Sequence, residues 1–155
     1  MDLDDISWLQ ASLPVRDGGL GVRCASTLAL SAFLASAAST SELQACILPT
    51  GSAELPYELA NSALDAWKTM TGAEPPTGAA THSQKEWDLL YTDKASTGLL
   101  ESTSCPRDRA RLLASRAPHS GDWMLAPPVT ALGLRLSDEE LRIAVGVRLG
   151  TTLCT

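Results

Sequence analysis

The sequence predicts a mainly α-helical chain, folded as a single irregular bundle of about six or seven short helices. Apolar residues recur at helical spacing in several segments, and no stretch shows the strict alternation typical of a strand. Ser-x-x-Glu patterns, which cap helix N-termini, precede several of these segments. The 11 glycines and 9 prolines among the 155 residues break the chain into short elements. Its length predicts one domain over residues 1–155.

The first half of the chain is expected to form four helices, over residues 4–12, 24–38, 39–48 and 57–71. Pro14 ends the first helix, together with the glycine turn that follows it. The second is apolar on nearly every face and is predicted to be central. Ser39 and Glu42 form a capping pattern that predicts a separate third helix. Gly72 is a natural stop for the fourth.

The second half begins with a Gly- and Pro-rich loop, residues 72–82, which is the candidate hinge. Ser83 starts a second capping pattern, and the helix after it weakens near Gly98. Pro106 suits the first turn of the next helix. Ser137 starts a third capping pattern, before a final helix that is apolar most of the way round and therefore predicted to be buried. We therefore expect three helices in this half: one that begins after Ser83, one over residues 107–117 and one over residues 138–149. The segment over residues 129–136 is expected to be extended or turn-like.

The charge is unevenly distributed along the chain. The formal net charge is −6, yet residues 105–155 contain seven arginines and five acidic residues. The acidic remainder argues against nonspecific coating of DNA by the whole chain. The arginine-bearing C-terminal third is the only electrostatic footprint for a nucleic acid.

The four cysteines stand at widely separated positions and form no C-x-x-C pair, so their spacing does not indicate a zinc site. We expect reduced, mostly buried thiols, with a two-disulfide framework as the alternative. The N-terminus is acidic and does not resemble a targeting segment. The most apolar run, Leu28–Ala38, falls short of the roughly 20 residues that cross a bilayer. No membrane partner is therefore expected.

Catalytic signatures are missing from the sequence. His82 and His119 stand in predicted loops, and the chain has neither a G-x-S-x-G nor a Walker A pattern. Asp4 and Asp5 stand at a predicted helix start, where acidic residues are favoured without any catalytic role. We therefore expect no enzyme activity, no cofactor and no metal. A small enzyme would need a pocket that unites His82 or His119 with a cysteine or a carboxylate.

Two groups of arginines have alternative interpretations. Arg107 and Arg111 stand four residues apart on one predicted helix face. They either contact phosphates or form a solvated face with Asp108 as a local partner. Arg142 and Arg148 stand in the apolar final helix. They either reach a ligand or neighbouring domain, or pair with Glu139 and Asp138.

The segment LPVRDGGLGVR, residues 13–23, carries the strongest local pattern. Its three glycines, Gly18, Gly19 and Gly21, allow a sharp turn with close backbone packing. Arg16 and Arg23 flank the turn and suit a polyanion or a carboxylate.

This segment resembles the LPxxxGGLGIR stretch that follows the reverse transcriptase domain in animal non-LTR (LINE-type) retrotransposon polyproteins. A second similar block carries WMLAPP at residues 123–128, RIAVGVRLG at 142–150 and Leu153-Cys154. The resemblance therefore covers blocks 13–38 and 123–154, with a loosely matched middle. In such polyproteins this region lies between the polymerase and a downstream Cys/His cluster. Cys154 looks like the first ligand of that cluster.

The resemblance implies a non-catalytic thumb- or linker-like segment that positions domains around RNA or DNA. The polymerase palm motif and any run of metal ligands are absent from the sequence. The expected partners are flanking polyprotein domains and a nucleic-acid backbone, in an intracellular setting that includes the nucleus. The alternatives are a helical protein-interaction module, in which the apolar helices 24–38 and 138–149 complete a core with a partner, and a relic open reading frame without a nucleic-acid role. The residues expected to contact the backbone are Arg16, Arg23, Arg107, Arg111, Arg142 and Arg148.

Overall fold

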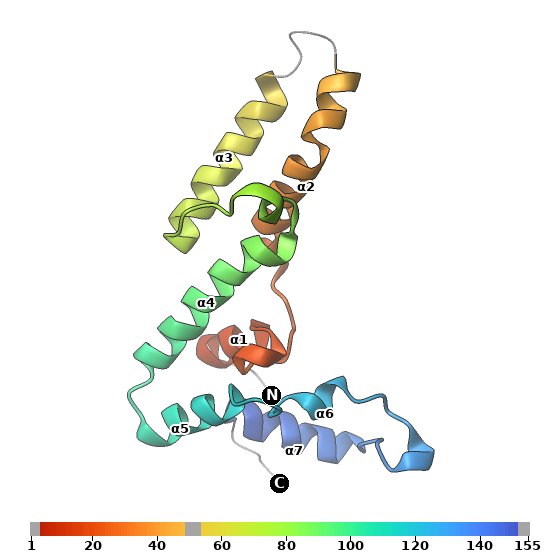
Figure 1. The fold of residues 1–155 in the computed structure, drawn as a ribbon. Helices are drawn as coiled ribbons and strands as arrows, with labels where there is room; N and C mark the ends of the chain where they lie inside the picture. The colour runs from red at the N-terminus through yellow and green to blue at the C-terminus, as the bar shows by residue number, and fades with distance from the viewer. Residues whose placement is uncertain (1–3, 49–53, 152–155) are drawn as a thin grey trace. The chain divides into compact units, whose positions relative to one another are not determined.

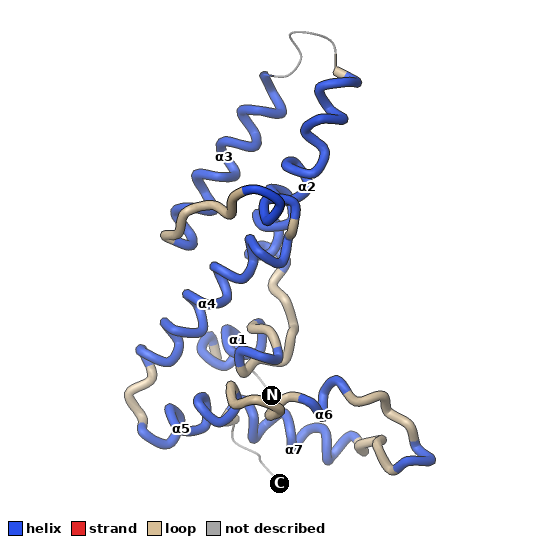
Figure 2. Tube along the Cα trace, viewed as in Figure 1, coloured by secondary structure: helices blue, strands red, loops and turns tan. Residues whose placement is uncertain are grey.

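A computed structural model describes residues 4–48 and 54–151 of the chain (Figure 1). Within these residues the fold has seven α-helices, three short 3₁₀ helices and no strand (Figure 2). The prediction of a mainly α chain is confirmed. In those same residues, no helix has both the length and the apolar character needed to cross a membrane.

The chain divides into two compact units, whereas its length predicts one domain. We call them the glycine-turn unit, residues 1–23 and 95–155, and the tryptophan unit, residues 24–94. One boundary falls inside a continuous helix, where the sequence has no break to mark it. The candidate hinge, residues 72–82, lies within the tryptophan unit and not at its edge.

The tryptophan unit contains α2 (Ala25–Ile47), α3 (Glu54–Thr71), the 3₁₀ helix η2 (Gly78–His82) and the first part of α4 (Gln84–Ser102). α2 replaces the two helices expected over residues 24–38 and 39–48. The Ser39 hydroxyl does not cap a new helix but donates to the Ala35 carbonyl at 2.7 Å, one turn earlier in the same helix. Such back-bonding is compatible with a continuous helix. α3 ends where expected, at Gly72 with φ +68°.

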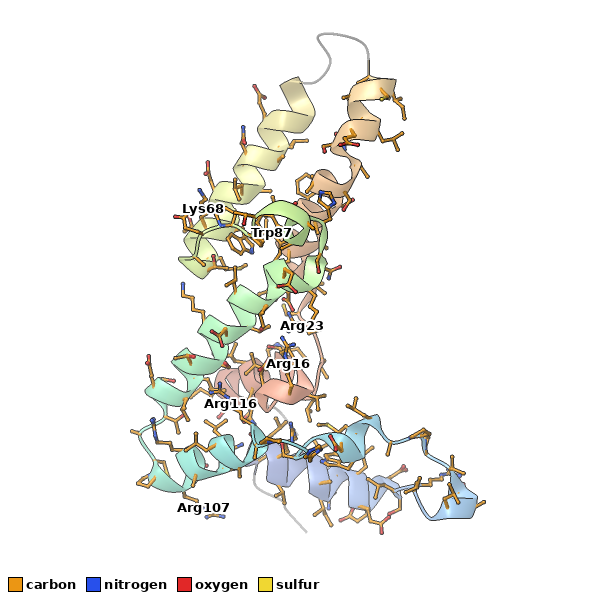
Figure 3. The ribbon with its side chains drawn as sticks, viewed as in Figure 1. Arg16, Arg23, Lys68, Trp87, Arg107 and Arg116 are labelled. Atoms are coloured by element: carbon orange, nitrogen blue, oxygen red, sulfur yellow. The ribbon has the colours of Figure 1, made fainter. Side chains whose placement is uncertain are left out.

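Two tryptophans form the centre of this unit's core. Trp67 and Trp87 meet edge to face, with ring centroids 4.9 Å apart and planes at 83°, and pack with Leu34 and Ala35 of α2. Figure 3 shows Trp87 on α4 beside the end of α3. The Trp87 indole N–H donates to the Thr81 carbonyl at 2.8 Å, which ties η2 to the core. α2 itself was predicted to be central, but Phe33, like other apolar residues of this helix, is exposed.

The glycine-turn unit contains α1 (Asp5–Ser12), the 3₁₀ helix η1 (Val15–Asp17), the last part of α4, α5 (Pro106–Ser115), α6 (Asp122–Leu125), the 3₁₀ helix η3 (Thr130–Leu132) and α7 (Asp138–Leu149). α7 contacts both α1 and α5. Leu13, Leu99 and Leu112 form a small apolar core. The capping box at Ser137 is confirmed, because its hydroxyl accepts the Glu140 N–H while the Glu140 carboxylate accepts the Ser137 N–H.

Candidate functional site

The glycine turn is a tightly packed backbone feature of the glycine-turn unit. Gly18 and Gly21 have φ values of +89° and +74°, which residues with a Cβ rarely adopt. Gly19 has an ordinary φ but no room, because a Cβ there would lie 2.0 Å from the Leu13 carbonyl oxygen. The Gly21 N–H donates to that carbonyl at 2.9 Å. The turn therefore needs glycine at each position for its own packing.

Arg148 is the side chain that holds this turn in place. It lies in the last turn of α7, and only 6% of its surface is exposed. Its guanidinium donates to four backbone carbonyls, those of Val15 (2.7 Å), Gly19 (3.0 Å), Ser115 (3.2 Å) and Ser120 (3.1 Å). Burial lowers the pKa of Arg148. The expectation that Arg148 contacts a nucleic-acid backbone is therefore wrong, because the donors that would bind a phosphate already donate to carbonyls inside the protein.

Gln10 and Arg111 extend the same network, which we call the arginine network (Gln10, Arg111 and Arg148). The buried Gln10 amide donates to the carbonyls of Gly18 and Arg148, each at 3.0 Å. Arg111 donates to the Gln10 side-chain oxygen at 2.8 Å and also to the Arg148 carbonyl. Arg111 is thus mainly structural too, although part of its side chain reaches the surface.

Three of the other predicted contacts lie at or near the surface. Arg107 is exposed on α5, and its side chain projects from the helix in Figure 3. Arg16 is exposed beside Asp17, with 3.3 Å between Nε and the nearest carboxylate oxygen. Arg23 is half-buried.

Arg142 is exposed but paired. Its guanidinium donates to both carboxylate oxygens of Glu139, at 2.8 and 3.0 Å, and this bonding lowers the pKa of Glu139. The alternative interpretation, that Arg142 pairs within its own helix, is therefore the one observed. Arg148, by contrast, pairs with neither Glu139 nor Asp138, since backbone carbonyls take its donors.

Among the groups considered for catalysis, His119 lies beside a carboxylate and Asp4 caps a helix. His82 and His119 are both exposed and belong to different units. His119 has a left-handed backbone, φ +67°, and its Nδ1 lies 2.8 Å from an Asp122 carboxylate oxygen. Asp4 caps α1, because its carboxylate accepts the Ser7 N–H at 2.7 Å, which lowers the pKa of Asp4.

Metal-binding residues and cysteines are also dispersed. No group of three His, Cys, Asp or Glu side chains that could hold a metal occurs in the part of the chain that is described. The expectation of mostly buried thiols is wrong for the described cysteines, since Cys46 and Cys105 are exposed and Cys24 is half-buried. Cys154 lies outside the described residues.

Residues 125–147 contain a stretch of exposed apolar side chains, which we call the apolar arm. Leu125, Leu132 and Val147 are 72%, 71% and 61% exposed. The expectation that the last helix is buried is therefore wrong for much of its surface, since α7 also exposes Leu141 and Ile143. The further large apolar residues that the arm exposes are Val129, Leu134 and Leu136.

An apolar groove of about 500 Å³ lies alongside the arm. Trp123 and Met124 of the α6 segment form one part of its lining, and Leu141 and Val145 of α7 form another. Single exposed apolar residues are normal in folded proteins, but contiguous apolar patches mark interaction surfaces. Leu134, Leu136 and Leu141 are exposed and also line the groove, so this part of the arm has the second character.

No protein-family model matches the chain. Searches of curated proteins and of solved structures also gave no match.

Proposed function

We propose that this chain is a non-catalytic helical segment that connects and positions neighbouring protein domains, as its resemblance to the post-polymerase region of non-LTR retrotransposon polyproteins implies. The observation that supports this proposal is the apolar arm. Burying such side chains against a partner contributes roughly 25 cal/mol for each Å² of apolar surface removed from water. A protein surface that covers the arm therefore stabilises the chain considerably.

The expected partner is an apolar face of an adjoining protein domain. Its centre is expected to be aliphatic or aromatic, to match the arm and groove. Its rim is expected to be polar, because Arg135, Arg142 and the acidic first turn of α7 border the arm.

Dye binding tests whether the arm is the dominant uncovered apolar surface. The variant carries Leu132→Ser and Val147→Ser, and the matched control carries Leu113→Ser, at an exposed apolar residue outside the arm. We expect the arm variant to lose more than half of the fluorescence of a bound apolar dye while its circular dichroism stays unchanged. Leu113→Ser should have a much smaller effect. Equal dye binding by the arm variant and the unmodified chain would refute the proposal.

The arginines proposed to contact a nucleic-acid backbone are Arg16, Arg23 and Arg107, because Arg142 pairs with Glu139 and Arg148 is buried. Three phosphate contacts predict that affinity for structured RNA falls with salt, with a log–log slope of about −2 to −3. Titration of structured RNA at low and high salt measures this slope. Absence of binding at low salt would remove the nucleic-acid part and leave the docking role standing.

A further inference from the structure

α2 of the tryptophan unit has an apolar stripe on the face that points away from its own core. Phe33, Leu43 and Ile47 are 43%, 59% and 69% exposed. Leu34 and Ala35, which pack in the tryptophan core, lie on the opposite face of the helix. A surface helix normally carries polar and charged side chains opposite its core-facing side. α2 therefore has a second face that suits burial.

The stripe has the spacing of a helix-pairing seam. Its positions alternate between intervals of four and three residues, as the core positions of a coiled coil do. We call these six positions the α2 seam: Ala29, Phe33, Ser36, Thr40, Leu43 and Ile47. Thr40 is half-buried and the other five are exposed.

The α2 seam is symmetric about residue 38. An antiparallel second copy of α2, related by a two-fold axis at this point, therefore places every seam position opposite another. The three pairs are Ala29 with Ile47, Phe33 with Leu43, and Ser36 with Thr40. A shift by one heptad sets Phe33 against Ser36 in one direction and Leu43 against Thr40 in the other. Only the centred register keeps hydroxyl against hydroxyl, and a polar pair in a seam fixes its register.

Charge identifies a second copy of this chain as the occupant. The formal net charge is −6, so two copies repel each other wherever charged faces meet. α2 carries a single charged residue, Glu42, which stands outside the seam. Pairing of two α2 seams therefore leaves no buried charge without a partner. A basic protein, which the negative charge of the chain would attract, meets no charge to pair with along this seam.

The size of the seam predicts a weak dimer. Covering the six positions and their edges removes on the order of 500 Å² from each copy, about 1,000 Å² in total, which is the lower end of the range for specific interfaces. Association also costs translational and rotational freedom, so we expect a Kd of about 10–100 µM.

We infer that α2 pairs with the α2 of a second copy in an antiparallel homodimer centred on residue 38. The inference concerns the tryptophan unit alone and does not depend on the docking role of the apolar arm.

Sedimentation of the full chain under reducing conditions, from well below to well above the expected Kd, tests the dimer. Leu43→Ser with Ile47→Ser should raise the Kd at least about tenfold, because both residues lie in the seam. The matched control is Leu59→Ser, at a 55% exposed leucine of α3 outside the seam, and it should leave the Kd unchanged. Circular dichroism checks that each variant keeps its helices. A monomer at every concentration would overturn the inference, as would a dimer that persists in the seam variant but is lost in the arm variant.

The exposed Cys46 of α2 tests the direction of pairing. In the antiparallel register the two Cys46 residues lie roughly 24 Å apart along the helices, and each stands one position from the residue opposite Ala29. Oxidation of Ala29→Cys with diamide should therefore give a covalent dimer in which position 29 is linked to Cys46, identified by peptide mass spectrometry. Ala29→Cys combined with Cys46→Ser should not give this product. A Cys46–Cys46 link in the unmodified chain would show parallel pairing and overturn the inference.

Discussion

Replacement of Arg148 by methionine tests the structural role of the buried arginine. The substitution keeps much of the side-chain volume but removes the guanidinium donor from four backbone carbonyls, of which those of Val15 and Ser115 keep a second donor. Hydrogen bonds to a charged group contribute about 1.5–3 kcal/mol each, so four set an upper bound on the order of 6–12 kcal/mol. Loss of the guanidinium also recovers its desolvation cost of several kcal/mol, so we expect a net destabilisation of about 3 kcal/mol.

Amide hydrogen exchange resolved by peptide measures this loss within one unit. Opening of residues 8–23 should become roughly a hundredfold faster, since each 1.4 kcal/mol corresponds to a factor of ten. Exchange in the tryptophan core should not change. Arg142→Met is the matched control, because the exposed Arg142–Glu139 pair contributes at most about 0.5 kcal/mol. Unchanged exchange over residues 8–23 in Arg148→Met would refute the reasoning.

Two further predictions concern glycine packing and pH. Gly19→Ala should destabilise the chain by about 2 kcal/mol or more, because its Cβ would overlap the Leu13 carbonyl. Gly98→Ala, in an open position of α4, should instead stabilise the chain by about 0.5–1 kcal/mol. Urea unfolding compares the two variants, and equal effects on the free energy of unfolding would contradict the packing argument. Hydrogen bonds from Ser137 lower the pKa of Glu140, so this pKa is lower in the folded state than in the unfolded state. The contribution of these hydrogen bonds to stability is therefore present above the ordinary glutamate pKa of about 4.3. It is lost as the pH falls through the lowered folded pKa. NMR titration of the Glu140 carboxyl checks this, and a pKa at or above the ordinary value would be inconsistent with the capping box.

Local signals in the sequence predicted most of the helices. The capping pattern at Ser137 and the stop at Gly72 depend on neighbouring residues only, so they could be identified without the structure. Ser39 shows the limit of this approach. A Ser-x-x-Glu pattern inside a helix has the same letters as one at its start, and no glycine or proline stands nearby to separate the two cases.

The role of Arg148 could not be predicted, because its partners leave no mark in the sequence. It binds backbone carbonyls, which every residue has, and the most distant of them is 133 positions away. An arginine in an apolar helix therefore suggested a ligand contact or a nearby acidic partner. Arg142 could be predicted better, since its partner Glu139 stands one helical turn away.

The exposure of α7 shows a different limit. An apolar helix predicts burial, but the sequence does not say whether the covering surface belongs to the same chain. In the described structure, Leu141 and Val147 remain exposed. The prediction that the last helix is buried is therefore wrong for these residues.

The most direct test of the positioning role compares the arm in this chain with the arm in the polypeptide encoded around it. Amide exchange over residues 125–147 would be measured in both. The proposal predicts flanking coding sequence for further domains and exchange at least about tenfold slower in the longer polypeptide, as the arm packs against its neighbour. Unchanged exchange, or a reading frame without neighbouring domains, would contradict it.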